Sequence, residues 1–140
     1  MYLSRLLVSH FKNIDAAALD FSPGINVLYG DNGEGKTNLL DAIYYLSVCK
    51  SSVSVPDRDV IAYEQGEATL FGQYAMDSGV HEKISCSVSR EGDKFFKRNN
   101  KRYEKLSLHL GLIPVVMVSP QDTSLVYGSG EERRKYMNFL

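Results

Sequence analysis

Gly30-Asp-Asn-Gly-Glu-Gly-Lys-Thr37 is the stretch of this sequence that decides the fold. It matches the pattern Gly-x-x-x-x-Gly-Lys-[Ser/Thr], in which the backbone N–H groups of a glycine-rich loop surround phosphate oxygens. The apolar residues 25–29 predict a short buried strand that enters this loop, and residues 37–46 predict a helix that leaves it. This order favours a nucleotide site over a plain glycine-rich turn, which needs neither the lysine nor the threonine.

Each residue type in the loop has a chemical reason to be there. Glycines permit backbone angles that a side chain forbids, and the start of the helix adds unpaired N–H groups and the positive end of its dipole. The ammonium group of Lys36 suits the β- and γ-phosphates, and the hydroxyl group of Thr37 suits Mg²⁺. We therefore expect ATP and Mg²⁺ as ligands, bound by Gly30, Asp31, Asn32, Gly33, Glu34, Gly35, Lys36, Thr37 and Asn38.

The composition is that of a soluble globular protein. The 140 residues are 44% hydrophobic and 24% charged, which fits one domain or a part of one. No apolar run is long enough to span a membrane, and no cleavage site of a signal peptide is present, so we expect a cytoplasmic protein without membrane contact. Because the net charge is −1, any contact with DNA must come from a local patch.

The hydrophobic pattern predicts an α/β fold of the P-loop NTPase class. Residues 1–50 are expected to form the P-loop core, including two strands before the loop. Residues 66–104 alternate apolar and polar positions between turn signals, which predicts an antiparallel β-meander subdomain. Residues 105–140 are expected to supply a return strand at 113–118, covered on both faces, and helices that start after Ser119 and Ser129.

The hydrolytic half of a P-loop enzyme is missing from this sequence. Such enzymes need a second carboxylate, commonly Asp or Asp-Glu directly after an apolar strand, and no such strand occurs here. Gln121 or Asp122 could complete the shell of Mg²⁺ and water, with Gln121 as the preferred metal ligand, or could simply serve the start of a helix. We therefore expect the N-terminal part of a longer protein, with little ATPase activity by itself.

The motifs together resemble the RecF family of bacterial recombinational-repair ATPases, which are related to the heads of SMC proteins. The resemblance rests on three parts of the chain: Phe11-Lys12-Asn13; Pro23–Leu28 with the loop and the following Asn38–Leu46; and Ser119–Asp122 with Leu125-Val126 and Gly128–Arg134. Residues 50–110 match more loosely. Two positions depart from the family pattern, because Gln121 and Asn138 stand where acidic residues are usual.

The resemblance implies an ABC-type ATPase head that dimerises with ATP between its subunits. It also implies binding of gapped DNA and of single-strand/double-strand junctions, a role in the SOS response, and cooperation with RecO and RecR in loading recombinase. Lys12 matches a basic position that contacts nucleotide in related heads, or is an ordinary lysine at a strand end. Arg133 and Arg134 match paired arginines of the family, or form a solvated helix face.

A cluster of basic and aromatic residues lies between residues 94 and 105. Such a hairpin could bind DNA phosphates and stack on a base, or could be a charged hairpin whose aromatic side chains face the core. The candidate DNA contacts are Lys97, Arg98, Lys101 and Arg102.

Two other functions are compatible with the loop. A small-molecule kinase would use Lys36 and Thr37 for phosphoryl transfer, although a β-meander after the loop is unusual for one. A non-catalytic, nucleotide-gated DNA-binding module is the other alternative.

Overall fold

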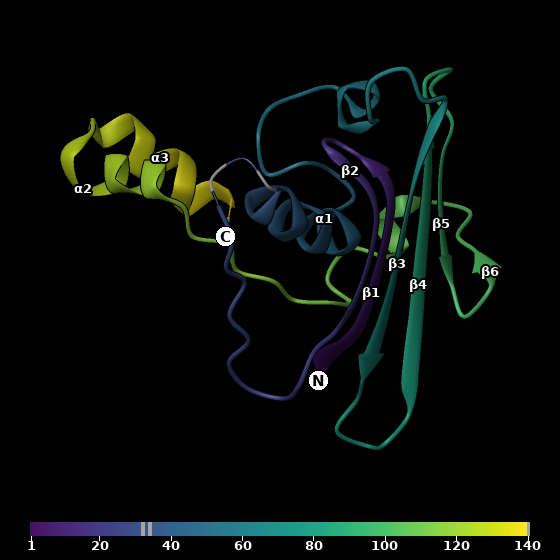
Figure 1. Ribbon diagram of the computed structural model, residues 1–140. Helices are drawn as coiled ribbons and strands as arrows, with labels where there is room; N and C mark the ends of the chain where they lie inside the picture. Colours follow the sequence, from purple (N-terminus) through teal and green to yellow (C-terminus); the bar gives the residue numbers. More distant parts are fainter. Residues whose placement is uncertain (32, 34, 140) are drawn as a thin grey trace.

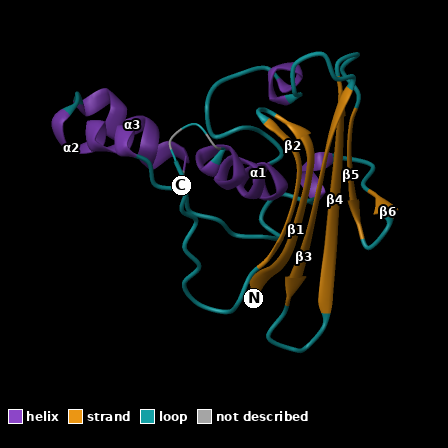
Figure 2. Ribbon diagram, in the orientation of Figure 1, coloured by secondary structure: helices purple, strands orange, loops and turns teal. Residues whose placement is uncertain are grey.

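A computed structural model describes residues 1–31, 33 and 35–139 of the protein. Six antiparallel strands form one sheet in the order β2-β1-β3-β4-β5-β6, and helix α1 lies against one of its faces (Figures 1 and 2). The strands are β1 (Tyr2–Phe11), β2 (Ile14–Asp20), β3 (Glu67–Ala75), β4 (His81–Ser89), β5 (Lys94–Arg98) and β6 (Lys101–Arg102). The helices are α1 (Lys36–Val48), α2 (Ser124–Tyr127) and α3 (Gly130–Phe139), with short 3₁₀ helices η1 (Asp57–Val60), η2 (Leu106–Leu108) and η3 (Pro120–Thr123).

The predicted meander is present. Along β3 and β4 every second side chain is buried, as expected for strands that turn one face to a core. Asn99 and Asn100 adopt positive φ angles of 51° and 67° and close the turn between β5 and β6. The sheet does not stop at the meander, because β1 pairs with β3, with Leu6 opposite Gly72 and Val8 opposite Leu70. The two strands before the loop and the meander after it therefore share one sheet.

Helix α1 can approach the sheet closely because position 72 has no side chain. A Cβ atom at Gly72 would lie 3.0 Å from Leu46 Cδ1 and 2.9 Å from Tyr74 Cε2. The helix buries Ala42, Tyr45 and Leu46 against the sheet. The helical spacing of Leu39, Leu40, Ile43 and Leu46 predicts that these four side chains pack on the sheet, and this is wrong for Leu40, which is 46% exposed.

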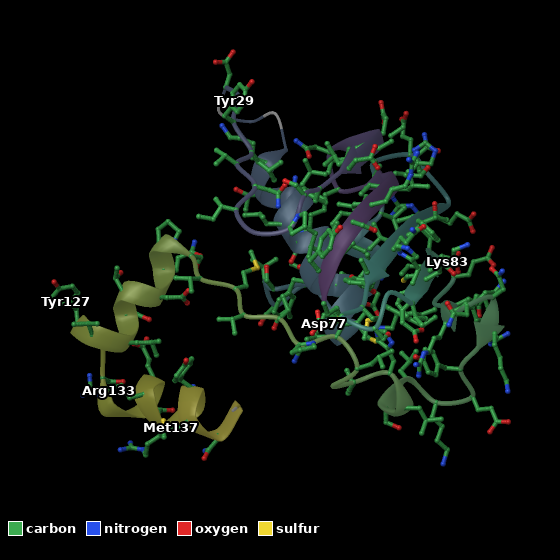
Figure 3. All side chains as sticks on the ribbon, turned by 90° about the horizontal axis from the view of Figure 1, so that it is seen from below. Tyr29, Asp77, Lys83, Tyr127, Arg133 and Met137 are labelled. Carbon is green, nitrogen blue, oxygen red and sulfur yellow. The ribbon has the colours of Figure 1, made fainter. Side chains whose placement is uncertain are left out.

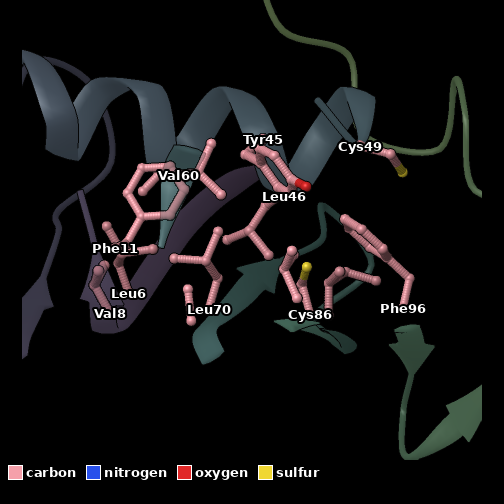
Figure 4. Packing of buried hydrophobic residues seen from close by; sticks show 14 of the residues in the cluster. Leu6, Val8, Phe11, Tyr45, Leu46, Cys49, Val60, Leu70, Cys86 and Phe96 are labelled. Carbon is pink, nitrogen blue, oxygen red and sulfur yellow. The ribbon is translucent and has the colours of Figure 1, made fainter. Parts of the chain in front are cut away.

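Aromatic side chains form the centre of the core (Figure 4). The Tyr45 ring meets Phe11 edge-on at a centroid distance of 5.9 Å and stacks with Phe96 at 6.2 Å. His109, which is fully buried, continues the row at 5.2 Å from Phe96. The Tyr45 hydroxyl donates a hydrogen bond of 2.7 Å to Asp57, so its polar end is satisfied at the rim of the core.

Two predicted strands are not formed. Residues 25–29 and 114–118 have no regular structure, and neither segment pairs with a strand among the described residues. Several of their apolar side chains are exposed, with Ile25 at 92%, Tyr29 at 90% and Val116 at 88% (Figure 3 labels Tyr29). An apolar run forms a strand only where a neighbouring strand can pair with its backbone. The described sheet has β2 and β6 as its edge strands, and neither pairs with these two segments.

The segment from Ser119 onward forms helices, as predicted. The Ser119 N–H donates to Asp122 Oδ2 at 2.5 Å, and Pro120 occupies the first helical position, but the first turn is a 3₁₀ helix. Helices α2 and α3 pack against each other and lie apart from the sheet (Figures 1 and 3). In the described part of the chain, no helix combines the length and the apolar character needed to cross a membrane.

A buried ionic network fixes α1 to the turn between β1 and β2. Lys12 Nζ lies 2.7 Å from Asp41 Oδ2, and Asp41 is 1% exposed. Asp41 also accepts hydrogen bonds from the Ser51 hydroxyl at 2.7 Å and from the Ser52 N–H at 2.6 Å. Burial raises the pKa of Asp41, but the hydrogen bonds from Lys12, Ser52 and Ser51 outweigh it, and the resulting pKa lies below the usual value.

We predict that Asp41→Asn destabilises the protein by about 2–4 kcal/mol at pH 7, because Lys12 loses its buried partner. A folded-state pKa below the unfolded one makes the contribution of Asp41 complete above the usual aspartate pKa and lost as the pH falls through the folded value. The stability difference between wild type and variant should therefore shrink below about pH 4. Urea unfolding at several pH values tests this, and a difference that does not depend on pH would contradict it.

Candidate nucleotide-binding site

The glycine-rich loop closes onto the N-terminus of α1. Gly35 occupies the N-cap position with φ of 96°, and its carbonyl accepts the first helical hydrogen bond from Leu39 N–H at 2.9 Å. Gly33 has φ of 87°. These left-handed conformations favour glycine, and they turn the loop so that the unpaired N–H groups of the first helical turn are available to an anion.

Lys36 and Thr37 start the helix at the mouth of this loop. The Lys36 ammonium group donates hydrogen bonds to the carbonyl oxygens of Gly30 and, at 3.3 Å, of Asp31. The loop itself thus holds an ammonium group, which is the kind of group that binds phosphate oxygens. Thr37 is exposed, so its hydroxyl group is accessible to a ligand.

Asn13, at the turn between β1 and β2, fastens the loop from outside. Its Nδ2 donates to the Gly33 carbonyl at 3.2 Å, and its Oδ1 accepts from Asn38 Nδ2 at 2.7 Å. The same Oδ1 lies 3.0 Å from the point where a Cβ of Gly35 would be. One side chain therefore contacts the middle of the loop, its last glycine and the first turn of α1.

Two hollows flank the loop. The smaller, of about 170 Å³, is lined by polar and glycine residues of the loop together with Asn13. The larger, of about 630 Å³, includes Lys36 and Thr37 but is lined mostly by apolar side chains such as Val27, Leu28 and Leu40. Because anions need hydrogen-bond donors, the loop and the helix N-terminus suit a phosphate better than the apolar hollow does.

The opposite end of α1 is fixed by groups far away in sequence. His109 Nε2 donates to the Leu46 carbonyl at 2.6 Å, and the Tyr103 hydroxyl lies 3.2 Å from His109 Nδ1. Lys94 Nζ donates to the Cys49 carbonyl at 2.7 Å. Burial lowers the pKa of His109, which keeps the ring neutral and able to make both bonds. These contacts satisfy carbonyl groups of the last helical turn and hold the helix that carries the loop.

Lys12 is directed to the buried network rather than to the loop. Its ammonium group is shared between Asp41 and, at 3.3 Å, the Ser51 hydroxyl, and its side chain is only 17% exposed. To contact a nucleotide, Lys12 would have to leave Asp41 unpaired in the core, which is costly. The geometry supports a structural role for Lys12, and its contact with nucleotide stays a prediction.

Gln121 and Asp122 lie in η3, where their side chains bond to the backbone or hydroxyl of Ser119. Among the described residues, the hydrogen bonds of these two side chains go to Ser119 and not to the loop. Within the described residues, no group of three or more His, Cys, Asp or Glu side chains could hold a metal ion. The roles of Gln121 and Asp122 at Mg²⁺ therefore stay predictions, as do the nucleotide contacts of Asn32 and Glu34, which lie outside the described residues.

The basic hairpin of β5 and β6 is partly committed to internal contacts. Arg98 makes two hydrogen bonds to the Glu82 carboxylate, at 2.9 and 3.0 Å, and Phe96 is in the core. The Arg102 guanidinium group stacks on the Phe95 ring at 3.8 Å. Lys97, Lys101 and Arg102 are exposed, and so is Arg98. All four candidate DNA contacts are therefore exposed, but Arg98 is already paired with Glu82.

A family model described as the RecF/RecN/SMC N terminal domain matches residues 2–116. The chain belongs to this family. The chain is 47% identical over its full length to the DNA replication and repair protein RecF of Parabacteroides distasonis, and 46% identical to that of Phocaeicola vulgatus. It spans 38% of the length of each of these curated relatives. The resemblance to RecF seen in the sequence is confirmed.

Solved structures agree with this assignment. RecF bound to ATP, described as a recombination mediator of the RecFOR pathway, superposes with a TM-score of 0.87 at 29% identity, over 96% of this chain and 36% of that chain. An SMC ATPase superposes with a TM-score of 0.80 at 21% identity, over 99% of this chain and 98% of that chain, which shows the shared fold. The predicted fold class, the N-terminal part of an ABC-type P-loop head with an antiparallel meander, is confirmed.

Sequence reasoning found the loop of this RecF-family chain but missed the side chains that hold it. The described loop residues do gather at the start of α1, as predicted. The sequence pattern placed Asn13 in the Phe11-Lys12-Asn13 motif without a role of its own, and it indicated no role for Asp41 or His109. Asp41 carried a signal, because a carboxylate beside the apolar positions of a helix needs a buried partner. His109 carried none, since its partners are 6 and 63 residues away.

We predict that Gly35→Ala weakens ATP binding at least about tenfold, because alanine is strained at φ of 96° and its Cβ would crowd Asn13. Gly92→Ala is the matched control, since Gly92 has φ of 100° and open space around the Cβ position in a distant turn. Calorimetric titration of both variants with ATP separates the two effects. Equal affinities in the two variants would show that the close fit at Gly35 does not matter.

Proposed function

We propose that the chain carries the ATP-binding half of a RecF-type DNA repair ATPase. The observation that supports this is the complete phosphate-binding loop at the N-terminus of α1, with Gly33 and Gly35 in left-handed conformations and Lys36 on the loop. A RecF structure bound to ATP shares this fold with a TM-score of 0.87. The residues of the loop therefore fit the triphosphate of a nucleotide in both shape and charge.

Within this site each residue has a separate task. The N–H groups at the start of α1 donate to phosphate oxygens, and the Lys36 ammonium group moves from the Gly30 and Asp31 carbonyls to the phosphates. Thr37 offers its hydroxyl oxygen to Mg²⁺, which would neutralise charge between the phosphates. Gln121 is our proposed further ligand near the metal. Asn38 and Asp31 complete the rim of the loop.

Turnover would require parts of a longer protein. The chain spans 38% of the length of its curated relatives, and the second carboxylate of the hydrolytic site is absent from it. Exposed apolar residues of segments 25–29 and 114–118, and the apolar hollow beside Lys36, are suited to being covered by further strands. We propose that the longer protein is a weak, DNA-dependent ATPase and that this part alone has little activity.

The biological role that fits is gap repair in the cytoplasm. ATP between two heads would form a homodimer that binds DNA at single-strand/double-strand junctions and helps to load recombinase with RecO and RecR during replication and the SOS response. An SMC relative of the same fold is described as undergoing ATP-driven dimerisation and DNA-stimulated activation. The small-molecule kinase alternative finds no support in the family assignment. A nucleotide-gated DNA-binding module describes this part of the protein when taken by itself.

In the full-length protein we expect Lys36→Ala to weaken ATP binding at least about tenfold, since charge-assisted hydrogen bonds to the phosphates are lost. Thr37→Ala should mainly remove the gain in affinity that Mg²⁺ provides. Titrations with ATP in the presence and absence of Mg²⁺ distinguish the two variants. Lys135→Ala, at an exposed position of α3, is the control, and wild-type binding by both loop variants would refute the site.

For DNA, we expect the combined variant Lys97→Glu, Lys101→Glu and Arg102→Glu to weaken binding by the full-length protein. The slope of log affinity against log salt should flatten by about 2–3, because fewer counterions are released. The matched control is Lys97→Arg, Lys101→Arg and Arg102→Lys, which keeps every charge and should keep the slope. ATP binding should be the same in both. An unchanged slope in the glutamate variant would assign these residues to a solvated surface.

A further inference from the structure

We propose that Asn13 is a positioning residue for nucleotide binding, which holds the phosphate-binding loop in the conformation seen in this structure. The inference rests on the proposed ATP site and names a residue outside the loop on which that site depends. Its basis is the pair of hydrogen bonds that the amide makes with Gly33 and Asn38, together with the position of its oxygen over Gly35.

The two polar atoms of the Asn13 amide reach two different parts of the site. Nδ2 donates to the Gly33 carbonyl at 3.2 Å, in the middle of the loop, and Oδ1 accepts from Asn38 Nδ2 at 2.7 Å, in the first turn of α1. The amide thereby links Gly33 in the loop to Asn38 in the first turn of α1, in addition to the backbone hydrogen bond from Leu39 N–H to the Gly35 carbonyl. Asn13 itself is anchored, because it lies between β1 and β2, which pair along their length.

The bond to Gly33 has an electrostatic consequence for phosphate. A carbonyl oxygen that turned into the loop would repel phosphate oxygens, since both carry negative charge. While Asn13 engages the Gly33 carbonyl, that oxygen is held toward Asn13, and Lys36 and the helical N–H groups are left to face the anion. The smaller hollow, of about 170 Å³, is bounded by Asn13 together with these same residues.

Gly35 ties the arrangement together sterically. Because Asn13 Oδ1 would lie 3.0 Å from a Cβ at position 35, any other residue there would crowd the amide and force it to shift. The left-handed conformation of Gly35 and the position of Asn13 thus depend on each other. Removal of the amide would let the loop sample other shapes before phosphate binds, and the affinity would fall by the cost of reordering it.

The test uses the full-length protein with ATP and Mg²⁺ as the probe. Asn13→Ala removes both contacts, and Asn13→Asp keeps the shape and the acceptor for Asn38 but places a carboxylate against the Gly33 carbonyl. We expect about 3- to 15-fold weaker ATP binding for Asn13→Ala, from the usual value of one or two lost hydrogen bonds, and at least as large a loss for Asn13→Asp. Asp15→Ala, an exposed change on the adjacent strand, is the matched control and should bind like wild type.

Two further measurements separate positioning from a general loss of stability. The melting temperature without nucleotide should stay within about 2 °C of wild type, whereas the rise in melting temperature that ATP produces should shrink. In a double-mutant cycle, Asn13→Ala and Asn38→Ala should be non-additive, because they remove the same contact.

Three outcomes would overturn the proposal, and the measurements distinguish them. If both Asn13 variants bind ATP like wild type while Lys36→Ala does not, Asn13 does not position the loop and the ATP site stands. If Lys36→Ala also binds like wild type, the ATP site itself is wrong, and the inference about Asn13 falls with it. A loss of affinity in Asn13→Ala that matches a loss of melting temperature, with normal binding by Asn13→Asp, would also overturn the proposal.

Discussion

The close packing of α1 against β3 is the constraint on which the rest of the structure depends. It requires a position without a side chain, Gly72, because Leu46 fills the space that a Cβ would take. This contact sets the height of the helix above the sheet and brings Tyr45 into the row of rings between Phe11 and Phe96. The loop ends where this helix begins, so the geometry of the candidate nucleotide site depends on packing far from it.

Both ends of α1 are then fixed by side chains from other elements. His109 and Lys94 bind carbonyl groups at its C-terminal end, and Asn13 binds the loop and Asn38 at its N-terminal end. A helix held at both ends can present its N–H groups to an anion without first becoming ordered. Such preorganisation reduces the entropic cost of binding, which is the advantage of building a phosphate site on a packed helix.

The Lys12–Asp41 pair shows how the core and the site compete for charged groups. A cation beside a phosphate-binding loop would suit a nucleotide, but Asp41 is buried and needs a partner. In this structure Lys12 is the charged partner of Asp41, and its contact with nucleotide stays a prediction. The exposed apolar segments 25–29 and 114–118 show the opposite situation. There, many apolar side chains are left uncovered by the described residues, and the curated relatives are more than twice as long as this chain.

The sequence alone determined the loop, the helix after it and the antiparallel meander. Each depends on local rules: glycines with positive φ, a cation and a hydroxyl at a helix start, and alternation with a period of two. The same rules failed for residues 25–29 and 114–118, because an apolar run becomes a strand only where another strand is available to pair with it. They also failed for Leu40, which fits the helical pattern but is exposed.

Only the tertiary structure showed that β1 pairs with the meander, that Lys12 forms an ion pair with Asp41, and that Asn13 bonds to Gly33 and Asn38. Those contacts join residues 20 to 73 positions apart, and their geometry is set by the folded sheet rather than by any local pattern.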